Sequence, residues 1–341
     1  MAPKVSVCLP NLNTRPFLAE RLDCILAQSF GDWELVICDN FSDDGAWEIF
    51  KQYAARDARI RIHQEPRAGM YANWNNCVRR AQGEYIYIAT SDDTMMPDCL
   101  EKMVAALDAN AECGLCQCEL LIIDEHGRVH ADDGWSTWLN YAPEWKGREH
   151  KRLAPHDGLL HFALRTVYTS ITQLLIRKTV FERVGYFDPR FGSCGDFEWE
   201  MRAALLYDVV YLPQKLATWR KHLSQATKPS ENSANRALML KMSQVAFERA
   251  RGLEPVALGE ISLRGWLRFY RQQYFDFALA ERGTRARRLV FLLIEAVLFN
   301  PSAWRHLASR VRGEPKADMR VELRRKLAAL PGSQLVIPVV R

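Results

Sequence analysis

The sequence predicts an α/β fold in which a mostly parallel sheet is flanked by helices and followed by an α-helical C-terminal region. Strand-like apolar runs alternate with amphipathic helical segments four times near the N-terminus, a pattern typical of right-handed βαβ units. The runs also end in polar, turn-forming residues, and the carboxyl ends of parallel strands share one edge of a sheet. We therefore expect a polar site at that edge.

Composition and charge divide the chain into two parts. The 341 residues are 48% hydrophobic and 26% charged, enough for one large domain with an appendage. The net charge is +5, but from Asn235 onward 20 Lys and Arg oppose 9 Asp and Glu, a balance of +11 that leaves −6 for residues 1–234. We expect an N-terminal domain over residues 1–230 and a basic helical region over residues 231–341, with different partners.

The nine cysteines are scattered, and several lie inside apolar runs, which favours reduced cysteines in a cytoplasmic protein. The cluster Cys113, Cys116 and Cys118 suggests zinc, but no second pair follows at the spacing of a structural site, so buried strand cysteines are favoured. No secretory signal is expected at the N-terminus. The apolar run 289–299 is too short to span a bilayer.

The alternation begins with three strand–helix pairs. Each expected strand is short and apolar, and each helix carries apolar residues three or four positions apart. Pro16 opens the first helix, and the turn formers after Asp39 can cap the second. The pairs cover residues 5–10 and 16–28, 34–38 and 46–55, and 59–63 and 71–81.

The fourth strand, residues 85–89, is followed by two adjacent acids, Asp92 and Asp93. Neighbouring carboxylates repel each other unless a cation or hydrogen-bond donors neutralise them, and such oxygen ligands suit Mg²⁺ or Mn²⁺ carrying a phosphate. The alternative is an acidic turn that caps the next helix, since Pro97 stands where its first turn would begin. That helix is expected to end near residue 110.

The later elements are expected from the same signals. Residues 131–157, rich in Trp, Gly, His and charge, show no periodicity and are expected to form an irregular surface region beside the site. Further strands are expected over residues 116–123, 172–176 and 209–212, and further helices over residues 178–184 and 195–207.

Five motifs in order resemble the family 2 glycosyltransferases of the GT-A fold over about residues 4–227. They are Val-Cys-Leu-Pro-Asn-Leu-Asn13, Ile-Cys-Asp39 with Ser42 and Asp43, Gly69-Met-Tyr-Ala-Asn-Trp-Asn75, Gly83-Glu-Tyr leading to Ser91-Asp92-Asp93, and Gly-Tyr-Phe-Asp followed by Gly195-Asp196. The resemblance implies an inverting, metal-dependent enzyme of the surface-polysaccharide type. It would move one sugar from a nucleoside diphosphate sugar, with UDP expected, to a hydroxyl of a saccharide or lipid-linked acceptor.

The resemblance also implies which residues form the site. Asp196 would be the catalytic base that takes the acceptor's proton, with Glu198 and Glu200 as nearby alternatives. Asp93 and His222 would hold Mn²⁺ or Mg²⁺. Asp39 would recognise the nucleobase of the donor, Asp92 would lie near the ribose and the metal, and Arg220 would bind the phosphate groups. The full set expected to bind the donor is Pro10, Asn11, Asn13, Asp39, Ser42, Gly69, Asn75, Asp92 and Arg220.

The chain departs from the family pattern at several positions. Asp39-Asn40-Phe41-Ser42 stands where many relatives carry Asp-Asp-Gly-Ser, Thr90 replaces a common Asp, Trp74 replaces an Arg that often contacts the nucleotide, and Gly195 replaces a common Glu. The identity of the nucleobase in the donor is therefore open. The Gln-x-x-Arg-Trp pattern of processive synthases is missing, which favours a single addition.

Two other classes remain as alternatives. A nucleotidyltransferase usually carries a glycine-rich, basic loop after the first strand, and segment 10–15 contains no glycine. A nucleotide-sugar-binding module without transferase activity is the second alternative. No recognised nucleic-acid motif is found, so nucleic acid is not an expected partner.

The resemblance leaves the region after Asn235 unexplained. Arg285, Arg287 and Arg288 precede the apolar segment 289–294, a grouping typical of peripheral contact with an anionic membrane. The alternatives are packing on the catalytic domain and formation of a homodimer. We expect a cytoplasmic location, at the inner face of the plasma membrane if these helices bind it. Helical patterns cover residues 237–251, 262–280, 284–300 and 304–310.

Overall fold

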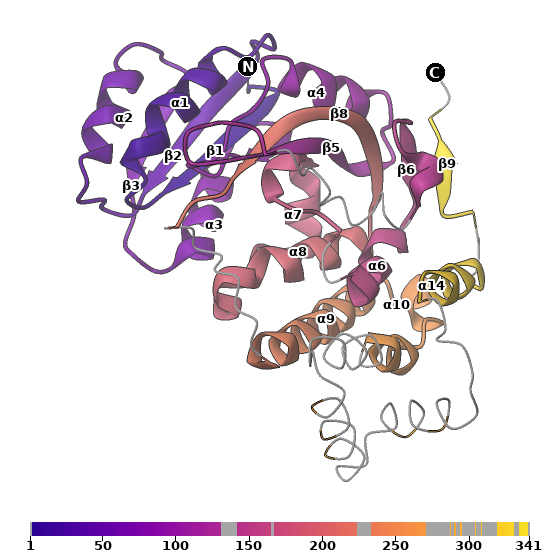
Figure 1. Ribbon diagram of the computed structural model, residues 1–341. Helices are drawn as coiled ribbons and strands as arrows, with labels where there is room; N and C mark the ends of the chain where they lie inside the picture. Colours follow the sequence, from indigo (N-terminus) through magenta and orange to yellow (C-terminus); the bar gives the residue numbers. More distant parts are fainter. Residues whose placement is uncertain are drawn as a thin grey trace.

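A nine-stranded sheet with helices on both faces forms the centre of the molecule (Figure 1). The computed structural model describes residues 2–130, 142–164, 167–223, 233–270, 319–330 and 334–339, together with residues 287, 290, 294, 304 and 308. The α/β class with flanking helices is confirmed. Within the described strands, four neighbouring pairs are parallel and four are antiparallel, so the sheet is mixed rather than mostly parallel.

The elements largely follow the expected order. The strands are β1 (Val5–Asn11), β2 (Trp33–Asp39), β3 (Ile60–Gln64), β4 (Tyr85–Ile88), β5 (Cys113–Ile123), β6 (His150–Arg152), β7 (Leu174–Arg177), β8 (Asp208–Arg220) and β9 (Val336–Pro338). The helices are α1 (Arg15–Leu26), α2 (Ala46–Ala54), α3 (Met70–Arg80), α4 (Cys99–Asp108), α6 (His156–Leu164), α7 (Lys178–Val184), α8 (Gly195–Ala204), α9 (Ser233–Leu253), α10 (Pro255–Gly259) and α14 (Met319–Ala328). Three short 3₁₀ turns cover Pro143–Trp145, Ile171–Gln173 and Pro189–Cys194.

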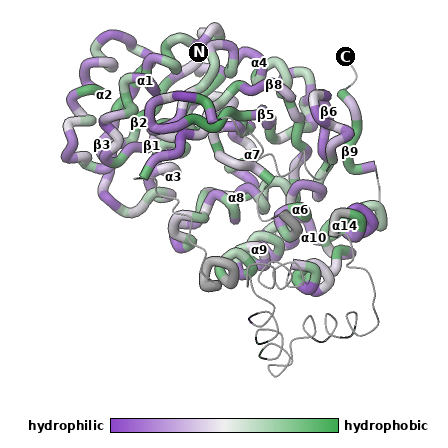
Figure 2. The backbone as a smooth tube through the Cα atoms, viewed as in Figure 1, coloured by the Kyte–Doolittle hydropathy of each residue, from purple (hydrophilic) through white to green (hydrophobic). Residues whose placement is uncertain are grey.

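The central strands are buried on both faces because helices cover both. Successive side chains of a strand point to opposite faces, so Val7 packs in the core shared with α1, α2 and α4, whereas Cys8 packs in the core shared with α3, α7 and α8. Figure 2 marks the hydrophobic residues of these strands in green. This double coverage explains why β1 and β2 read as continuous apolar runs.

Strand β8 is much longer than the four residues expected for it. Its pairing with β5 shifts register near Glu119, and such an irregularity bends a strand and increases its twist. Beyond the bend, Thr218 Oγ1 accepts the backbone N–H of Thr94 at 2.8 Å. The bent end of β8 is thus fastened to the loop that follows β4, which brings residues of the late sequence beside Asp92 and Asp93.

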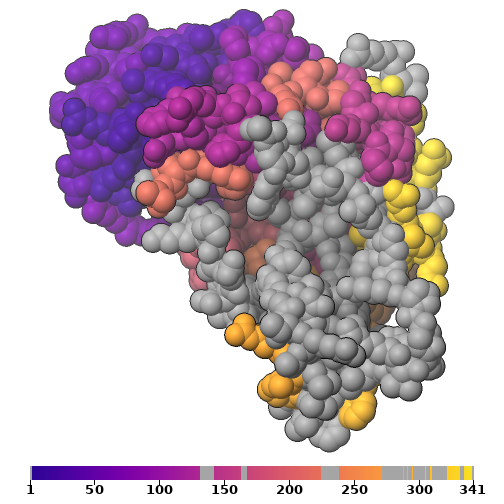
Figure 3. All heavy atoms as spheres, in the orientation of Figure 1, coloured from indigo at the N-terminus to yellow at the C-terminus, as the bar shows by residue number. Residues whose placement is uncertain are grey.

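The C-terminal region returns to the sheet. β9 pairs antiparallel with β6, at the far edge of the sheet from β3, and α9 and α14 contribute buried side chains to the same core as α8. Figure 3 shows the indigo N-terminal residues gathered in one lobe and the yellow C-terminal residues at the opposite side. The division at residue 230 remains a proposal.

The predictions for residues 131–157 and for the cysteines can be compared with the structure. The region 131–157 is not wholly irregular, because it holds β6 and the start of α6; residues 131–141 lie outside the described part. The cysteines of β5 are buried, as are most of the nine free cysteines, and the described residues hold no cluster of three or more metal-binding side chains. In the same ranges no helix is long and apolar enough to cross a membrane.

A buried polar cluster beside β6 predicts sensitivity to acid. Asp157 accepts a hydrogen bond from Arg152 Nε at 2.8 Å and lies 2.8 Å from His156 Nδ1, and all three residues are nearly inaccessible to solvent. Burial, reinforced by the charge of Arg152, lowers the pKa of His150 to about 3. Burial also lowers the pKa of His156. Both imidazoles are therefore neutral in the folded protein at neutral pH.

We expect His150 to lower the free energy of unfolding as the pH drops below the ordinary histidine pKa, because its imidazole binds a proton in the unfolded chain and not in the folded one. The buried Asp93, whose pKa is raised to about 7 in the folded protein, acts in the opposite direction over the same range. His150 alone contributes about 2 kcal/mol between pH 7.5 and pH 5. Urea denaturation of the wild type and of His150→Gln at both pH values isolates this contribution: on going from pH 7.5 to pH 5 the wild type should lose about 2 kcal/mol more, or gain that much less, than the variant. The same pH dependence in both proteins would contradict the expectation.

Candidate functional site

The loops after β1 and β2 form one hydrogen-bonded cluster at the carboxyl edge of the sheet. The fully buried carboxylate of Asp39 accepts hydrogen bonds from Asn11 Nδ2 at 2.7 Å, from Ser42 Oγ at 2.5 Å and from the Ser42 backbone at 2.9 Å. Ser42 Oγ in turn accepts the backbone N–H of Asn13 at 2.9 Å. Pro10 lies directly before this cluster, paired with Cys38. The structure therefore brings together five residues expected to bind the donor.

The tip of the second loop has a backbone that side chains rarely adopt. Phe41 has φ of 51° and Asn13 has φ of 54°, in the left-handed region that costs non-glycine residues stability. Arg67 compensates by donating hydrogen bonds to the carbonyls of Asn40 at 2.9 Å and Phe41 at 2.6 Å. This role of Arg67 was missed in the sequence, although Arg67 stands two residues before the Gly69 motif.

Helix α3 begins after Gly69, whose φ of 99° suits a glycine. Asn75 does not face the donor loops: its amide nitrogen donates to the Phe187 carbonyl at 2.9 Å, and its oxygen accepts the Phe187 N–H at 3.0 Å. Trp74 is buried and packs edge-on against Tyr71 and Phe187. These two residues therefore fasten α3 to the loop before α8, and the donor-binding role of Asn75 stays a prediction.

The two adjacent acids after β4 have different surroundings. Asp93 is buried, and its oxygens accept hydrogen bonds from the Arg220 backbone at 2.7 Å and from Thr90 Oγ1 at 2.5 Å. Burial, reinforced by the charge of Asp92, raises the pKa of Asp93 to about 7. Asp92 is more exposed, with its Oδ2 2.9 Å from His222 Nε2. Asp92 and His222 therefore face each other, whereas Asp93 is held inside the protein; the predicted role of Asp93 as a metal ligand stays a prediction.

Arg220, which is predicted to bind phosphate, makes several structural contacts with the protein. Its side chain is almost fully buried, and Nε donates to the Asp92 carbonyl at 2.6 Å while the terminal nitrogens reach Glu20 at 2.7 Å and the Asp124 carbonyl at 3.2 Å. Sequence spacing could not reveal these partners, which are far away in the chain. The guanidinium fixes the backbone of the acid pair, and its predicted contact with the donor phosphate stays a prediction.

Asp196 lies in the first turn of α8, partly exposed. Its Oδ1 accepts the Phe197 backbone N–H at 2.9 Å. Burial raises the pKa of its carboxyl group, and the Tyr71 hydroxyl opposes that rise. A raised pKa makes a carboxylate a better proton acceptor near neutral pH. A Cβ on Gly195 would lie 2.7 Å from the ring of Tyr71, so the Glu common at this position in relatives has no room here.

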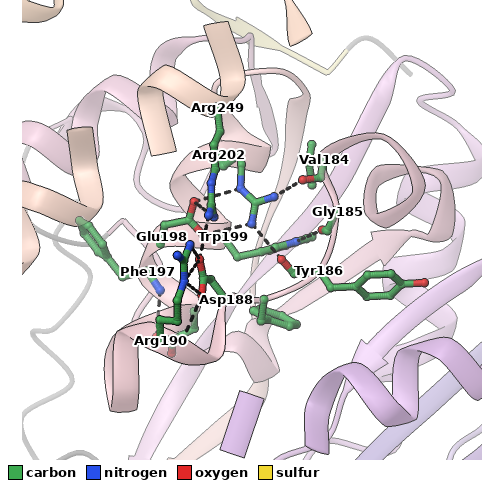
Figure 4. Close-up of polar contacts among 12 residues, drawn as sticks. Val184, Gly185, Tyr186, Asp188, Arg190, Phe197, Glu198, Trp199, Arg202 and Arg249 are labelled. Carbon is green, nitrogen blue, oxygen red and sulfur yellow. Dashed lines mark hydrogen bonds and ion pairs between the residues drawn. The ribbon is translucent and has the colours of Figure 1, made fainter. Parts of the chain in front are cut away.

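The surroundings of Glu198 and Glu200 argue against either of them as the catalytic base. Glu198 is fully buried and ion-paired with Arg202 and with Arg249, at 3.0 and 3.2 Å (Figure 4). Glu200 is also buried, and burial, reinforced by the charge of Asp196, raises its pKa well above the ordinary range. The raised pKa favours the protonated form of Glu200, which is a poorer proton acceptor than a carboxylate.

The first 165 residues are similar to known proteins. Residues 6–165 match the family model described as glycosyl transferase family 2. EpsE of Bacillus subtilis (strain 168), named as a candidate glycosyltransferase, is 39% identical over 127 residues, which cover 37% of this chain and 46% of EpsE. Glycosyltransferase GlyG of Streptococcus pneumoniae serotype 4 is 34% identical over 104 residues, 30% of this chain and 35% of GlyG. The matches span less than half the length of these curated relatives.

The whole fold is similar to a solved structure. S. aureus TarS 1-349, crystallised in complex with UDP-GlcNAc, matches with a TM-score of 0.58 at 15% identity, covering 92% of this chain and 93% of that chain. At this identity the likeness shows the fold alone. Because it covers 92% of this chain, the likeness extends beyond residue 165.

Proposed function

Because residues 6–165 match the family model of glycosyl transferase family 2, we propose that the protein belongs to this family and transfers one sugar from a nucleoside diphosphate sugar to a hydroxyl group of an acceptor. The observation that carries the proposal is the gathering of polar groups at one sheet edge. The Asn11–Asp39–Ser42 cluster ends β1 and β2, and the pair of Asp92 and His222 follows β4 and β8. This edge is where open α/β sheets bind ligands.

The reaction we propose is a single displacement. The acceptor oxygen attacks the anomeric carbon while the bond from that carbon to the diphosphate breaks, and Asp196 takes the proton of the acceptor hydroxyl. Attack opposite the leaving group inverts the anomeric configuration. The support for Asp196 is its partly exposed side chain and its raised pKa. In addition, Glu198 is engaged in ion pairs with Arg202 and Arg249, and the raised pKa of Glu200 favours its protonated form.

A divalent cation fits the donor set of Asp92 and His222, in place of the predicted Asp93. A carboxylate oxygen and an imidazole nitrogen are both suitable ligands, and Mg²⁺ or Mn²⁺ commonly takes its other ligands from substrate phosphates and water. When bound, the ion would supply positive charge to the departing diphosphate. Arg220 and Thr90 would contribute indirectly, because they fix the backbone and the buried acid behind Asp92.

A screen of sugar nucleotides tests this function. The purified chain is mixed with UDP-, GDP-, ADP- and dTDP-sugars in the presence of Mn²⁺ or Mg²⁺, and release of the nucleoside diphosphate is measured. We expect hydrolysis of a UDP-sugar, with UDP-GlcNAc as the first probe because TarS was crystallised with it. A chain that neither binds nor hydrolyses any sugar nucleotide would be a module of another kind, and the proposal would fail.

The finer features of the reaction remain proposals. We propose a saccharide or lipid-linked acceptor and a role in surface-polysaccharide synthesis. Contact with a membrane through the basic helices also stays a prediction, since Arg285 and Arg288 lie outside the described residues, as does most of the apolar segment that follows them.

A further inference from the structure

Five charged side chains form a connected ion network behind the first turn of α8 (Figure 4). Two carboxylates and three guanidinium groups take part, and they come from three separate stretches of the chain. They are Asp188, Arg190, Glu198, Arg202 and Arg249. Because Glu198 is fully buried, its charge requires such compensation.

Arg249 of α9 holds the chain on both sides of Asp196. One terminal nitrogen lies 2.8 Å from Asp188 Oδ2, and the other lies 3.2 Å from Glu198 Oε1. Asp188 precedes Asp196 in the sequence and Glu198 follows it. Figure 4 shows the Arg249 side chain between the two acids. A single planar group with two donors in fixed geometry therefore spans the segment that carries the proposed base.

The segment between these two anchors has little rigidity of its own. Gly192 interrupts the 3₁₀ turn with φ of 58°, and Cys194, the residue before α8, makes no side-chain capping hydrogen bond. In the first turn the Phe197 N–H is accepted by Asp196 itself, and a helix start without a capping side chain is less stable. The position of Asp196 consequently depends on anchors outside the segment.

The other half of the network is fixed to the protein core. Arg202 donates to the Tyr186 carbonyl at 2.9 Å and to the Val184 carbonyl, and Trp199 Nε1 donates to the Gly185 carbonyl at 2.7 Å. The pair with Arg202 thereby fixes the position of Glu198. Arg249 in turn links Glu198 to Asp188 through its two ion pairs.

We propose that Arg249 is a positioning residue for the base Asp196, so that helix α9, which lies outside the matched residues 6–165, contributes to the chemical step. This inference rests on the proposed function. The role differs from general stabilisation, since it acts on proton transfer and leaves the donor loops at the ends of β1 and β2 unchanged. A small misplacement of a catalytic group is enough to slow a reaction greatly.

The test compares substitutions of two arginines in the full-length chain. Arg249→Met removes both ion pairs. Arg249→Lys keeps the positive charge but lacks the planar group with two donors in fixed geometry. Arg183→Met is the matched control. Arg183 joins α7 to Glu254, the residue directly after α9, through a 2.7 Å pair, but that pair is well exposed and shares no residue with the five-residue network. Hydrolysis of UDP-GlcNAc, or of the donor that the screen selects, gives kcat and KM.

We expect Arg249→Met to lower kcat by roughly ten-fold or more with KM for the donor changed by less than about two-fold. Arg249→Lys should recover part of the loss, and Arg183→Met should match the wild type. An unchanged kcat in Arg249→Met, or a rise in KM as large as the fall in kcat, overturns the proposal. Thermal unfolding is measured in parallel; if Arg249→Met does not fold, Arg249→Lys is judged by the same criteria.

A double-mutant cycle separates positioning from a merely structural role. If Arg249 acts through Asp196, then adding Arg249→Met to Asp196→Asn should cause no further fall in kcat. The same fold-loss in both backgrounds would overturn the proposal. Full activity of Asp196→Asn alone would instead refute the assignment of the base, so the failure of the proposed mechanism and the failure of the positioning role give different results.

Discussion

Replacing Asp196 by Asn should lower kcat by roughly 10² or more, with the affinity for UDP unchanged. Asparagine keeps the shape of the side chain and can still accept the Phe197 N–H bond, but it cannot take a proton from the acceptor, and loss of a general base commonly has an effect of this size. The kcat is measured by donor hydrolysis and by transfer once an acceptor is found, and UDP affinity is measured by calorimetry.

Glu200 offers a matched control, because it lies one turn later in the same helix. Its raised pKa favours the neutral acid in the folded protein, and glutamine resembles a protonated glutamate in size and hydrogen bonding. We therefore expect Glu200→Gln to retain most of the activity. Loss of activity in Glu200→Gln together with retention in Asp196→Asn would move the base to Glu200.

Replacing Asp92 by Asn should weaken metal-dependent binding of UDP by roughly 100-fold or more, the upper range found when even an indirect partner of a metal is lost. The reason is that Asp92 is the exposed acid of the pair and faces His222. Calorimetric titration with UDP is carried out with Mn²⁺ and after treatment with EDTA. For the wild type, EDTA should cause a loss of affinity of the same order.

Asp93→Asn is the matched control at the adjacent position. Its side chain is buried and already bound to Thr90 and to the Arg220 backbone, so we expect a smaller effect on metal-dependent affinity and a larger one on stability. A result in which Asp93→Asn loses the dependence on metal while Asp92→Asn keeps it would restore Asp93 as the ligand.

The sequence by itself determined the N-terminal strands and helices and the meeting of the two loops that follow β1 and β2. Each of the first four strands and the helices between them appears within one or two residues of the expected start, because local apolar periodicity and turn-forming residues encode them. The grouping of Asn11, Asp39 and Ser42 followed as well. Parallel strands must end at one edge, so the loops that follow β1 and β2 had to meet.

Only the tertiary structure decided how the late residues act. Asp92 and Asp93 are neighbours in sequence and chemically identical, and they differ because the bent end of β8 covers one of them: the Arg220 backbone reaches Asp93 across 127 positions of the chain. The same contact made Arg220 a structural residue. Glu198 was set apart from Asp196 by Arg249, a partner on α9. Such pairings depend on a strand bulge and on helix packing, which no local pattern of residues encodes.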